Sequence, residues 1–202
     1  MPADPSGFET MPKQRSRTVL TGWVLAIVRA MEADGVDVDA ILQELGMDPA
    51  LLQGGYSRYS QEQVSRLWRR AIELTGDIDF GLKVAAQVRP GTFHAVGYAM
   101  SCSATLARAL RRFAFGCRVI SDSATAVLTE RGDTSRLEFY FDTGGAPPIY
   151  QTVETVIASV VSFLRWIINE PIAPLAVHHR HPNSGPSGNY ARFLGCAVLH
   201  GQ

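Results

Sequence analysis

The spacing of apolar residues changes along this chain, and that change limits the folds open to it more than any other feature. Between residues 18 and 117 apolar side chains recur at i, i+3, i+4 and i+7, whereas from Arg136 to Phe141 they alternate with polar ones. The first spacing indicates helices that bury one stripe, and the second indicates strands that bury one face. We therefore expect an α+β protein whose first half is helical.

Helices account for most of that first half. The clearest begins after Ser60, because Ser60 and Gln63 have the spacing of a capping box, and Gly76 ends it. Residues 18–33 have the same helical spacing, and Gly35 follows as a C-cap. Further helices are predicted at residues 37–45, 77–88, 93–101 and 103–117.

The second half is predicted to be mixed. Residues 124–129 and 136–141 are expected to form a β-hairpin, and the longest helix follows over Tyr150–Asn169. Its wide apolar stripe predicts burial on both sides, either between sheet and helices or between two subunits. An extended stretch to His181 and a strand over Cys196–His200 end the chain. The predicted arrangement is an N-terminal helical bundle packed against a small antiparallel sheet, which the long C-terminal helix crosses.

Length and composition favour a single domain over residues 18–202. The chain has 202 residues, 46% of them hydrophobic, which is enough to bury one substantial core. Residues 1–17 are polar and rich in proline, so they are predicted to be a disordered leader and not a secretory signal.

Charge and cysteine content exclude several classes of protein. The 19 basic and 19 acidic side chains cancel, so direct binding to nucleic acid is not expected. The densest apolar run, Val19–Val28, is far shorter than the roughly 20 residues of a membrane-spanning helix, so no such helix is expected. Three widely spaced cysteines do not form a disulfide framework. These features favour the cytoplasm and no membrane partner.

A search for catalytic motifs is negative. The sequence contains no dinucleotide-binding glycine motif, no Walker loop, no His-Glu-x-x-His and no EF-hand loop. Gly185–Gly188 contains a serine, but its spacing differs from that of a serine-hydrolase elbow. We expect no enzyme activity and no cofactor.

Histidines gather near the C-terminus. His178, His179 and His181 precede Cys196 and His200, and alternation along a strand places His179 and His181 on one face. A metal site is one interpretation. The interpretation favoured by sequence is that these side chains line the exposed face or the end of a strand, because structural zinc sites use tightly spaced ligand pairs.

Aromatic residues of the second half are candidates for the lining of an apolar ligand cavity, with ordinary core packing as the alternative. The candidates are Tyr98, Phe113, Phe115, Phe139, Phe141 and Trp166. Arg165 interrupts the long apolar helix, and its guanidinium could either hold a ligand carboxylate or extend to solvent.

Two segments together resemble a known family. The segment Gly97–Leu110, followed by the hairpin, and the tail from His179 to Val198 are similar to the N-terminal effector-binding domain of AraC-type transcriptional regulators. The similarity is to the arabinose-binding-like branch and not to the cupin branch, and it covers about residues 20 to 200. Ala197 departs from the pattern, because proline is common at that position of the tail.

The resemblance implies a domain that binds a small-molecule effector and forms a homodimer. In similar proteins a helix-turn-helix domain follows, and no residue follows Gln202 here, so we expect contact with DNA only through a C-terminal domain outside this chain. An amino acid, an aromatic acid, a fatty acid and a sugar all remain candidate effectors. The alternatives are a pure homodimerisation or interaction module without an effector, and a metal-dependent sensor.

Overall fold

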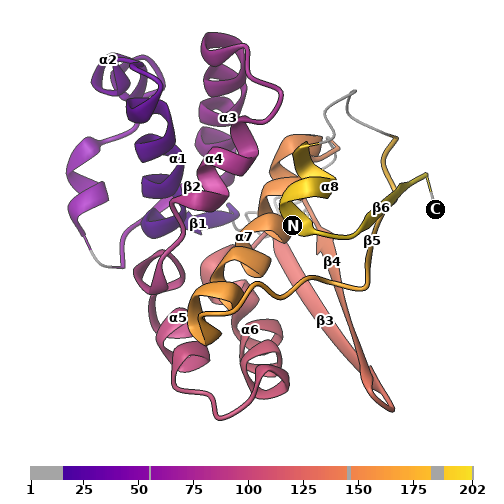
Figure 1. The fold of residues 1–202 in the computed structure, drawn as a ribbon. Helices are drawn as coiled ribbons and strands as arrows, with labels where there is room; N and C mark the ends of the chain where they lie inside the picture. Colours follow the sequence, from indigo (N-terminus) through magenta and orange to yellow (C-terminus); the bar gives the residue numbers. More distant parts are fainter. Residues whose placement is uncertain (1–15, 55, 145–146, 183–188, 202) are drawn as a thin grey trace, which may run out of the picture.

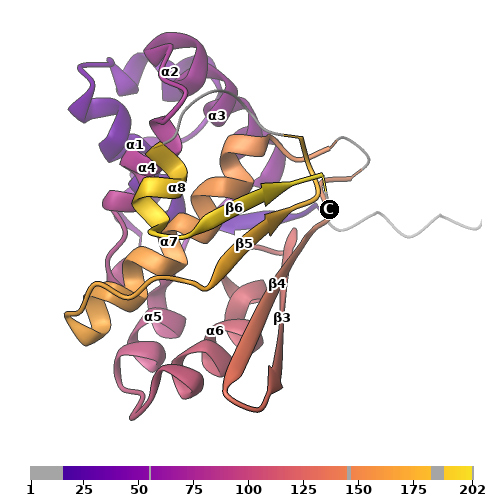
Figure 2. The same ribbon diagram turned by 45° about the vertical axis from the view of Figure 1, so that its right-hand side comes forward.

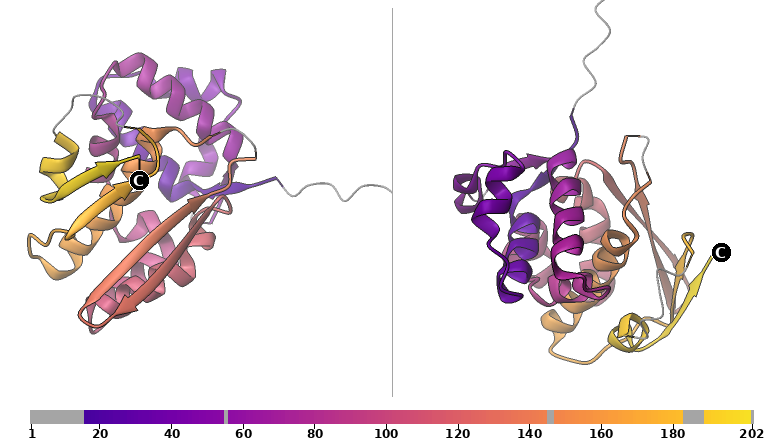
Figure 3. Two further views of the ribbon diagram at one scale, coloured as in Figure 1. Left: turned by 90° about the vertical axis from the view of Figure 1, so that its right-hand side faces the viewer. Right: turned by 90° about the horizontal axis from the view of Figure 1, so that it is seen from above.

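Helix α7, Tyr150–Ile168, runs through the middle of the molecule, with the N-terminal helices on one side and the hairpin and C-terminal strands on the other (Figure 1, Figure 3). The structure is a computed structural model that describes residues 16–54, 56–144, 147–182 and 189–201. Only Tyr150 and Trp166 among the 19 residues of α7 are exposed. The alternative of a subunit-facing stripe is therefore not needed to explain its composition.

The N-terminal half is helical, as the apolar spacing predicts. Its helices, including the short 3₁₀ helices η1 and η2, are α1 (Thr21–Ala33), α2 (Val38–Glu44), η1 (Pro49–Gln53), α3 (Gln61–Thr75), α4 (Phe80–Ala86), η2 (Pro90–Phe93), α5 (His94–Ser101) and α6 (Leu106–Ile120). The capping box before α3 is confirmed: Ser60 Oγ accepts from the Gln63 amide at 3.2 Å, and Gln63 Oε1 accepts from the Ser60 amide at 3.1 Å. Gly76 ends α3 in the left-handed conformation, with φ of +58°.

The strands confirm the α+β class, but their arrangement differs from the predicted single antiparallel sheet. In the described part of the chain they form three separate two-stranded ladders. The hairpin of β3 (Ala124–Arg131) and β4 (Thr134–Phe141) is the antiparallel pair that the alternation predicts. Strands β5 (Ala176–His179) and β6 (Ala197–His200) pair in parallel instead, and α8 (Asn189–Leu194) lies in the connection between them. Figure 2 shows this pair lying across α7.

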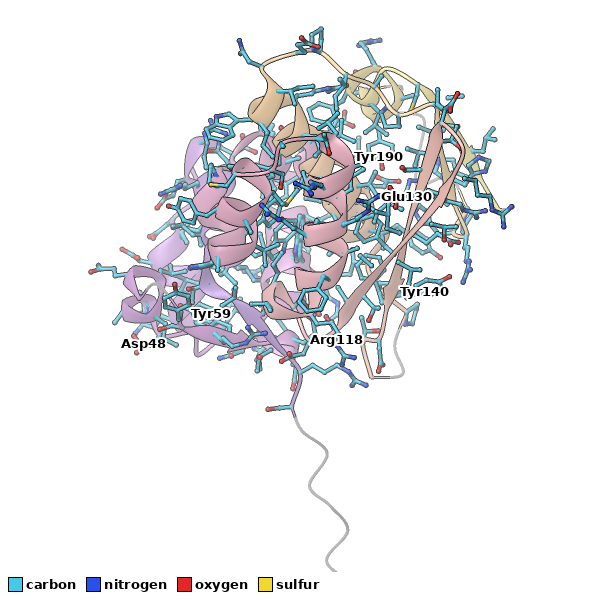
Figure 4. The ribbon with its side chains drawn as sticks, turned by 90° about the horizontal axis from the view of Figure 1, so that it is seen from below. Asp48, Tyr59, Arg118, Glu130, Tyr140 and Tyr190 are labelled. Carbon is cyan, nitrogen blue, oxygen red and sulfur yellow. The ribbon has the colours of Figure 1, made fainter. Side chains whose placement is uncertain are left out.

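Residues 18–20 form strand β1 and not the first turn of a helix. They pair antiparallel with β2 (Arg58–Ser60), about forty positions later. The Arg58 guanidinium fixes this junction by donating to Thr18 O at 3.0 Å and to Val119 O at 2.7 Å. Nearby, the Tyr59 hydroxyl donates to the carbonyl of Asp48 at 2.5 Å (Figure 4). No local pattern in the sequence indicates pairing over this distance.

The predicted leader falls almost entirely outside the described residues. Arg17, its last residue, forms an ion pair with Asp142, and its carbonyl accepts from the Gln61 amide at 2.8 Å. Arg17 is thus part of the folded structure.

Two clusters of buried apolar residues meet at α7. The larger joins the N-terminal helices, α6 and the start of the hairpin to one side of α7, where Val160, Phe163 and Leu164 are buried. The smaller joins Ala158 and Val161, on another side of α7, to residues of β5 and α8. Helix α7 has the length and apolar composition of a membrane span, and these contacts explain that composition as the burial of a core helix.

A close approach between two stretches of backbone explains why position 97, at the start of the segment Gly97–Leu110, is a glycine. A Cβ at Gly97 of α5 would lie 2.3 Å from the carbonyl oxygen of Pro90 and 3.2 Å from Cβ of Phe93. Neither atom is the end of a flexible side chain. Only glycine therefore lets α5 pack against η2 in this way.

We predict that Gly97→Ala destabilises the protein by about 1–3 kcal/mol, because the backbone must move apart to admit the methyl group. Alanine ordinarily stabilises a helix relative to glycine, so the sign of the change is diagnostic. The matched control is Gly91→Ala, since a Cβ there would meet nothing within 4 Å. Urea unfolding of the three proteins measures both effects, and equal stability of the two variants would contradict the packing argument.

Candidate functional site

A cavity of about 470 Å³ lies where α3, α6, α7 and the base of the hairpin meet. Its volume is in the range of about 300–1,000 Å³ that is typical of small-molecule sites. The walls come from segments as far apart in sequence as Val19 and Val160. The cavity therefore exists only in the folded chain.

Aromatic rings form much of its wall. Trp23 comes from α1, Trp68 from α3, Phe93 from η2, Phe113 from α6 and Phe141 from β4. Phe93 and Phe113 pack edge to face, with ring centroids 5.9 Å apart. This lining favours a ligand with a flat or apolar body.

One stripe of α7 forms another wall. Thr152, Val156 and Val160 line the cavity at i, i+4 and i+8. Ile149, just before the helix, also lines it. Residues at this spacing lie above one another on a helix. A ligand in the cavity would thus touch α7 over about two turns.

Polar groups are concentrated in the part of the lining built from α3 and the start of β3. Ser123 Oγ donates to Gln61 Oε1 at 2.6 Å, and the Ser121 and Ser123 hydroxyls are 2.8 Å apart. Arg69 and Glu62 add charged side chains, both exposed. Arg69 is in none of the ion pairs that the described residues form, and its side chain is on the lining of the cavity.

The indole N–H of Trp68 has no hydrogen-bond partner in the described part of the chain, although Trp68 lines the cavity and is only 1% exposed. Leaving a buried donor unsatisfied costs about 1–3 kcal/mol. An acceptor atom on a bound molecule would remove that cost.

The family model described as the N-terminal arabinose-binding domain of AraC transcription regulators matches residues 35–202. The chain belongs to this family. The match includes α3, α6, α7 and β4, which supply most of the cavity wall, and the family is regulatory and not enzymatic. A comparison with curated proteins finds no match.

The AraC-type domain brings only part of the sequence-predicted ligand set to the cavity. Phe113 and Phe141 line it. Phe139 lies behind them, stacked on Phe141 at 6.3 Å and edge to face with Phe113 at 6.0 Å, and is outside the lining. Whether any of these rings contacts an effector stays a prediction.

The remaining aromatic candidates lie on the outer surface of the AraC-type domain. Phe115 is 94% exposed, Tyr98 61% and Trp166 51%. Phe115 lies two positions from Phe113 on α6, and a step of two turns a helical residue to the opposite side. The sequence prediction assumed that these positions lie on buried faces, and these three do not.

Arg165 does not reach the cavity. Its guanidinium donates to the carbonyls of Ile172 at 2.7 Å, Phe193 at 2.7 Å and Leu194 at 2.8 Å. These bonds fasten the end of α8 and the segment after α7 to α7 itself. Both sequence interpretations, a carboxylate clamp and a solvent-facing arginine, are replaced by this structural role.

The C-terminal histidines separate into two groups. The rings of His179, His181 and His200 lie together, with centroids 4.4 to 5.4 Å apart. His178 points away and is exposed, and Cys196 lies just before the other end of the β5–β6 ladder. The shared face of His179 and His181 follows from strand alternation, as the sequence predicts.

Sequence reasoning missed the cavity residues of the AraC-type domain that come from α1, α3 and α7. Trp23, Trp68 and Val156 lie in the apolar stripes of the predicted helices, and such stripes indicate burial. A stripe does not distinguish a face that packs solidly from one that lines a cavity. No signal in a single sequence separates the two.

Cys117 provides a test of the cavity wall. Its side chain lines the cavity, is 3% exposed, and burial raises the pKa of its thiol to about 11. Because the thiolate is the reacting form, only about a thousandth of Cys117 is reactive at pH 8. We predict that a thiol reagent such as dithiobisnitrobenzoate modifies exposed Cys102 first and Cys117 last.

The measurement is the absorbance of released thionitrobenzoate over time in the folded protein. Cys102→Ser should remove the fast phase, and Cys117→Ser should leave it unchanged. A fast phase that disappears in Cys117→Ser would show that the cavity wall is open at this point.

Proposed function

We propose that this chain is the effector-binding domain of an AraC-type transcriptional regulator and that its effector occupies the cavity between α3, α6 and α7. The observation that carries the proposal is a 470 Å³ cavity with aromatic walls inside a chain of this family. A cytoplasmic location and DNA contact through a separate domain are part of the proposal.

The lining supports one class of effector. An apolar or aromatic body would fit against Trp23, Phe113 and Phe141. A hydrogen-bond acceptor would satisfy Trp68 Nε1, and an anionic group at the exposed side would meet Arg69. The proposed effector is therefore a compact amphipathic acid, which favours an aromatic or fatty acid over a sugar among the candidates.

Signal transmission would use the walls of this cavity. Effector binding changes a regulator only if the effector has different affinities for two conformations. Elements α3, α6, α7 and β4 all line the cavity. A change in the distances between these elements would therefore change the shape of the cavity. We expect α7, which also packs on α4 and α8, to carry such a change to the rest of the domain.

The test is a thermal-shift screen of the chain against amino acids, aromatic acids, fatty acids and sugars. A ligand at 100 times its Kd should stabilise the protein by about 2.7 kcal/mol. Val156→Trp should abolish the shift by filling the cavity, whereas Val127→Trp, on the exposed face of β3, should retain it. A shift that survives Val156→Trp in a folded protein would refute the assignment of the cavity.

Homodimerisation belongs to the same proposal, and one surface supports it. Phe115 and Val119 lie one turn apart on α6 and are 94% and 53% exposed. Exposed apolar side chains at this spacing are typical of a helix that packs against a partner. The pure interaction module stays the second candidate function on this observation.

We predict that Phe115→Glu shifts the protein from dimer toward monomer, because the carboxylate would be buried without a partner at the interface. Sedimentation velocity over a range of concentrations measures the change. Gln43→Glu, at an exposed position of α2, is the control for one added negative charge away from this surface. A concentration-independent monomer in the unmodified chain would refute the dimer, and a dimer without any ligand hit would favour the interaction module.

A further inference from the structure

A second group of chemically active side chains lies on another side of α7 from the cavity. Glu154 of α7, His179 of β5 and His181 just after β5 each offer one ligand atom, and these atoms lie within 4.8 Å of one another. His200 of β6 pairs in register with His179, and its ring centroid is 5.1 Å from that of His179. Three separate elements thus converge on one point.

His181 has the hydrogen-bonding pattern of a metal ligand. Its Nδ1 lies 2.8 Å from the carbonyl oxygen of Pro182. A carbonyl oxygen only accepts, so Nδ1 is the donor in this contact. Nε2 is buried and has no hydrogen-bond partner among the described residues. A metal-bound histidine characteristically donates its second ring N–H to a carbonyl or carboxylate in this way.

His179 and His200 also have a ring nitrogen that could bind a metal ion. His179 is 3% exposed and its Nε2 lies 3.2 Å from the Tyr190 hydroxyl, which leaves Nδ1 for a second partner. Figure 4 shows Tyr190 on the C-terminal side of the molecule. Nδ1 of His200 is buried without a partner in the described residues.

We propose that Glu154, His179 and His181 bind a divalent transition-metal ion of the zinc class, with His200 beside them as a further ligand. Two imidazoles and one carboxylate form a recurrent ligand set for such ions. Bonds of about 2.0–2.1 Å require the ligand atoms to lie about 3.4 Å apart, so the side chains close slightly around the ion. The proposal does not depend on the effector.

Ring stacking is the competing explanation of the cluster, and it leaves two facts unexplained. Tyr150 stacks on His181 with centroids 4.4 Å apart. A nitrogen lone pair lies in the plane of its ring, so a stacked neighbour on the ring face does not block coordination. Stacking also provides no partner for His181 Nε2 or His200 Nδ1.

The surrounding charges favour a cation. Glu154 contributes a carboxylate to the cluster. Arg180, the nearest arginine in sequence, places its guanidinium over the ring of Tyr140, 5.5 Å from the centroid. Bound metal would join β5 and β6 to α7, the helix that also forms a wall of the effector cavity.

The experiment uses the tag-free chain after treatment with a chelator. Zn²⁺ is titrated in by calorimetry, and Co²⁺ is added separately to record its visible absorption, which intensifies on tetrahedral coordination. We expect one ion per chain with both metals and a higher Tm with Zn²⁺. Absence of saturable one-to-one binding would overturn the proposal.

The variants separate this site from surface histidines. His181→Ala and Glu154→Gln should weaken Zn²⁺ binding at least about 100-fold, and His178→Ala should leave it unchanged, because His178 is exposed on the other face of β5. Circular dichroism establishes whether each variant is folded. If His181→Ala does not fold, His200→Gln serves as the second variant. Binding that survives both His181→Ala and His200→Gln, or that is lost in His178→Ala, refutes the site.

Discussion

The burial of α7 is the constraint on which the rest of the structure depends. Its apolar residues surround the helix, so it must be covered from several directions at once. The N-terminal helices and α6 cover one side through Val160 and Phe163, and β5 with α8 covers another through Ala158 and Val161. Arg165, the cation within this helix, is accommodated because three backbone carbonyls accept from it. The chain after α7 is held in place by the same contacts.

Helix α7 also determines where chemistry can occur. Thr152 and Val156 line the cavity, whereas Glu154, between them in sequence, meets the histidines of the C-terminal strands. Positions two apart on a helix point in nearly opposite directions, so one element borders both the cavity and the histidine cluster. A movement of α7 would be felt at both, because interiors are close-packed and transmit displacement. This geometry suits a domain whose family regulates transcription.

Sequence reasoning predicted the fold class, the capping box at Ser60, the hairpin and the long helix, because local spacing and capping residues determine these. It did not predict the pairing of Thr18–Leu20 with β2 or the parallel pairing of β5 with β6, since both join residues that are distant in the chain. For the cavity it named Phe113 and Phe141 among its lining residues but also chose Phe115, which faces solvent. It named His179 and His181 but not Glu154, which lies on a different element.

By itself, the sequence determined most of the helices, the hairpin, the apolar face of each, and the family to which the chain belongs. The helices, the hairpin and their apolar faces follow from side-chain spacing and backbone preference within a few residues, whereas the family follows from motifs spread along the chain. The tertiary structure alone decided that the apolar faces of α3, α6 and α7 leave a cavity between them, and that three histidines meet a glutamate of α7. A cavity and a ligand cluster are relations among surfaces of distant segments. Burial of an apolar stripe is favourable against any well-fitting partner. The stripe therefore specifies that it will be covered, but it does not specify which segment covers it.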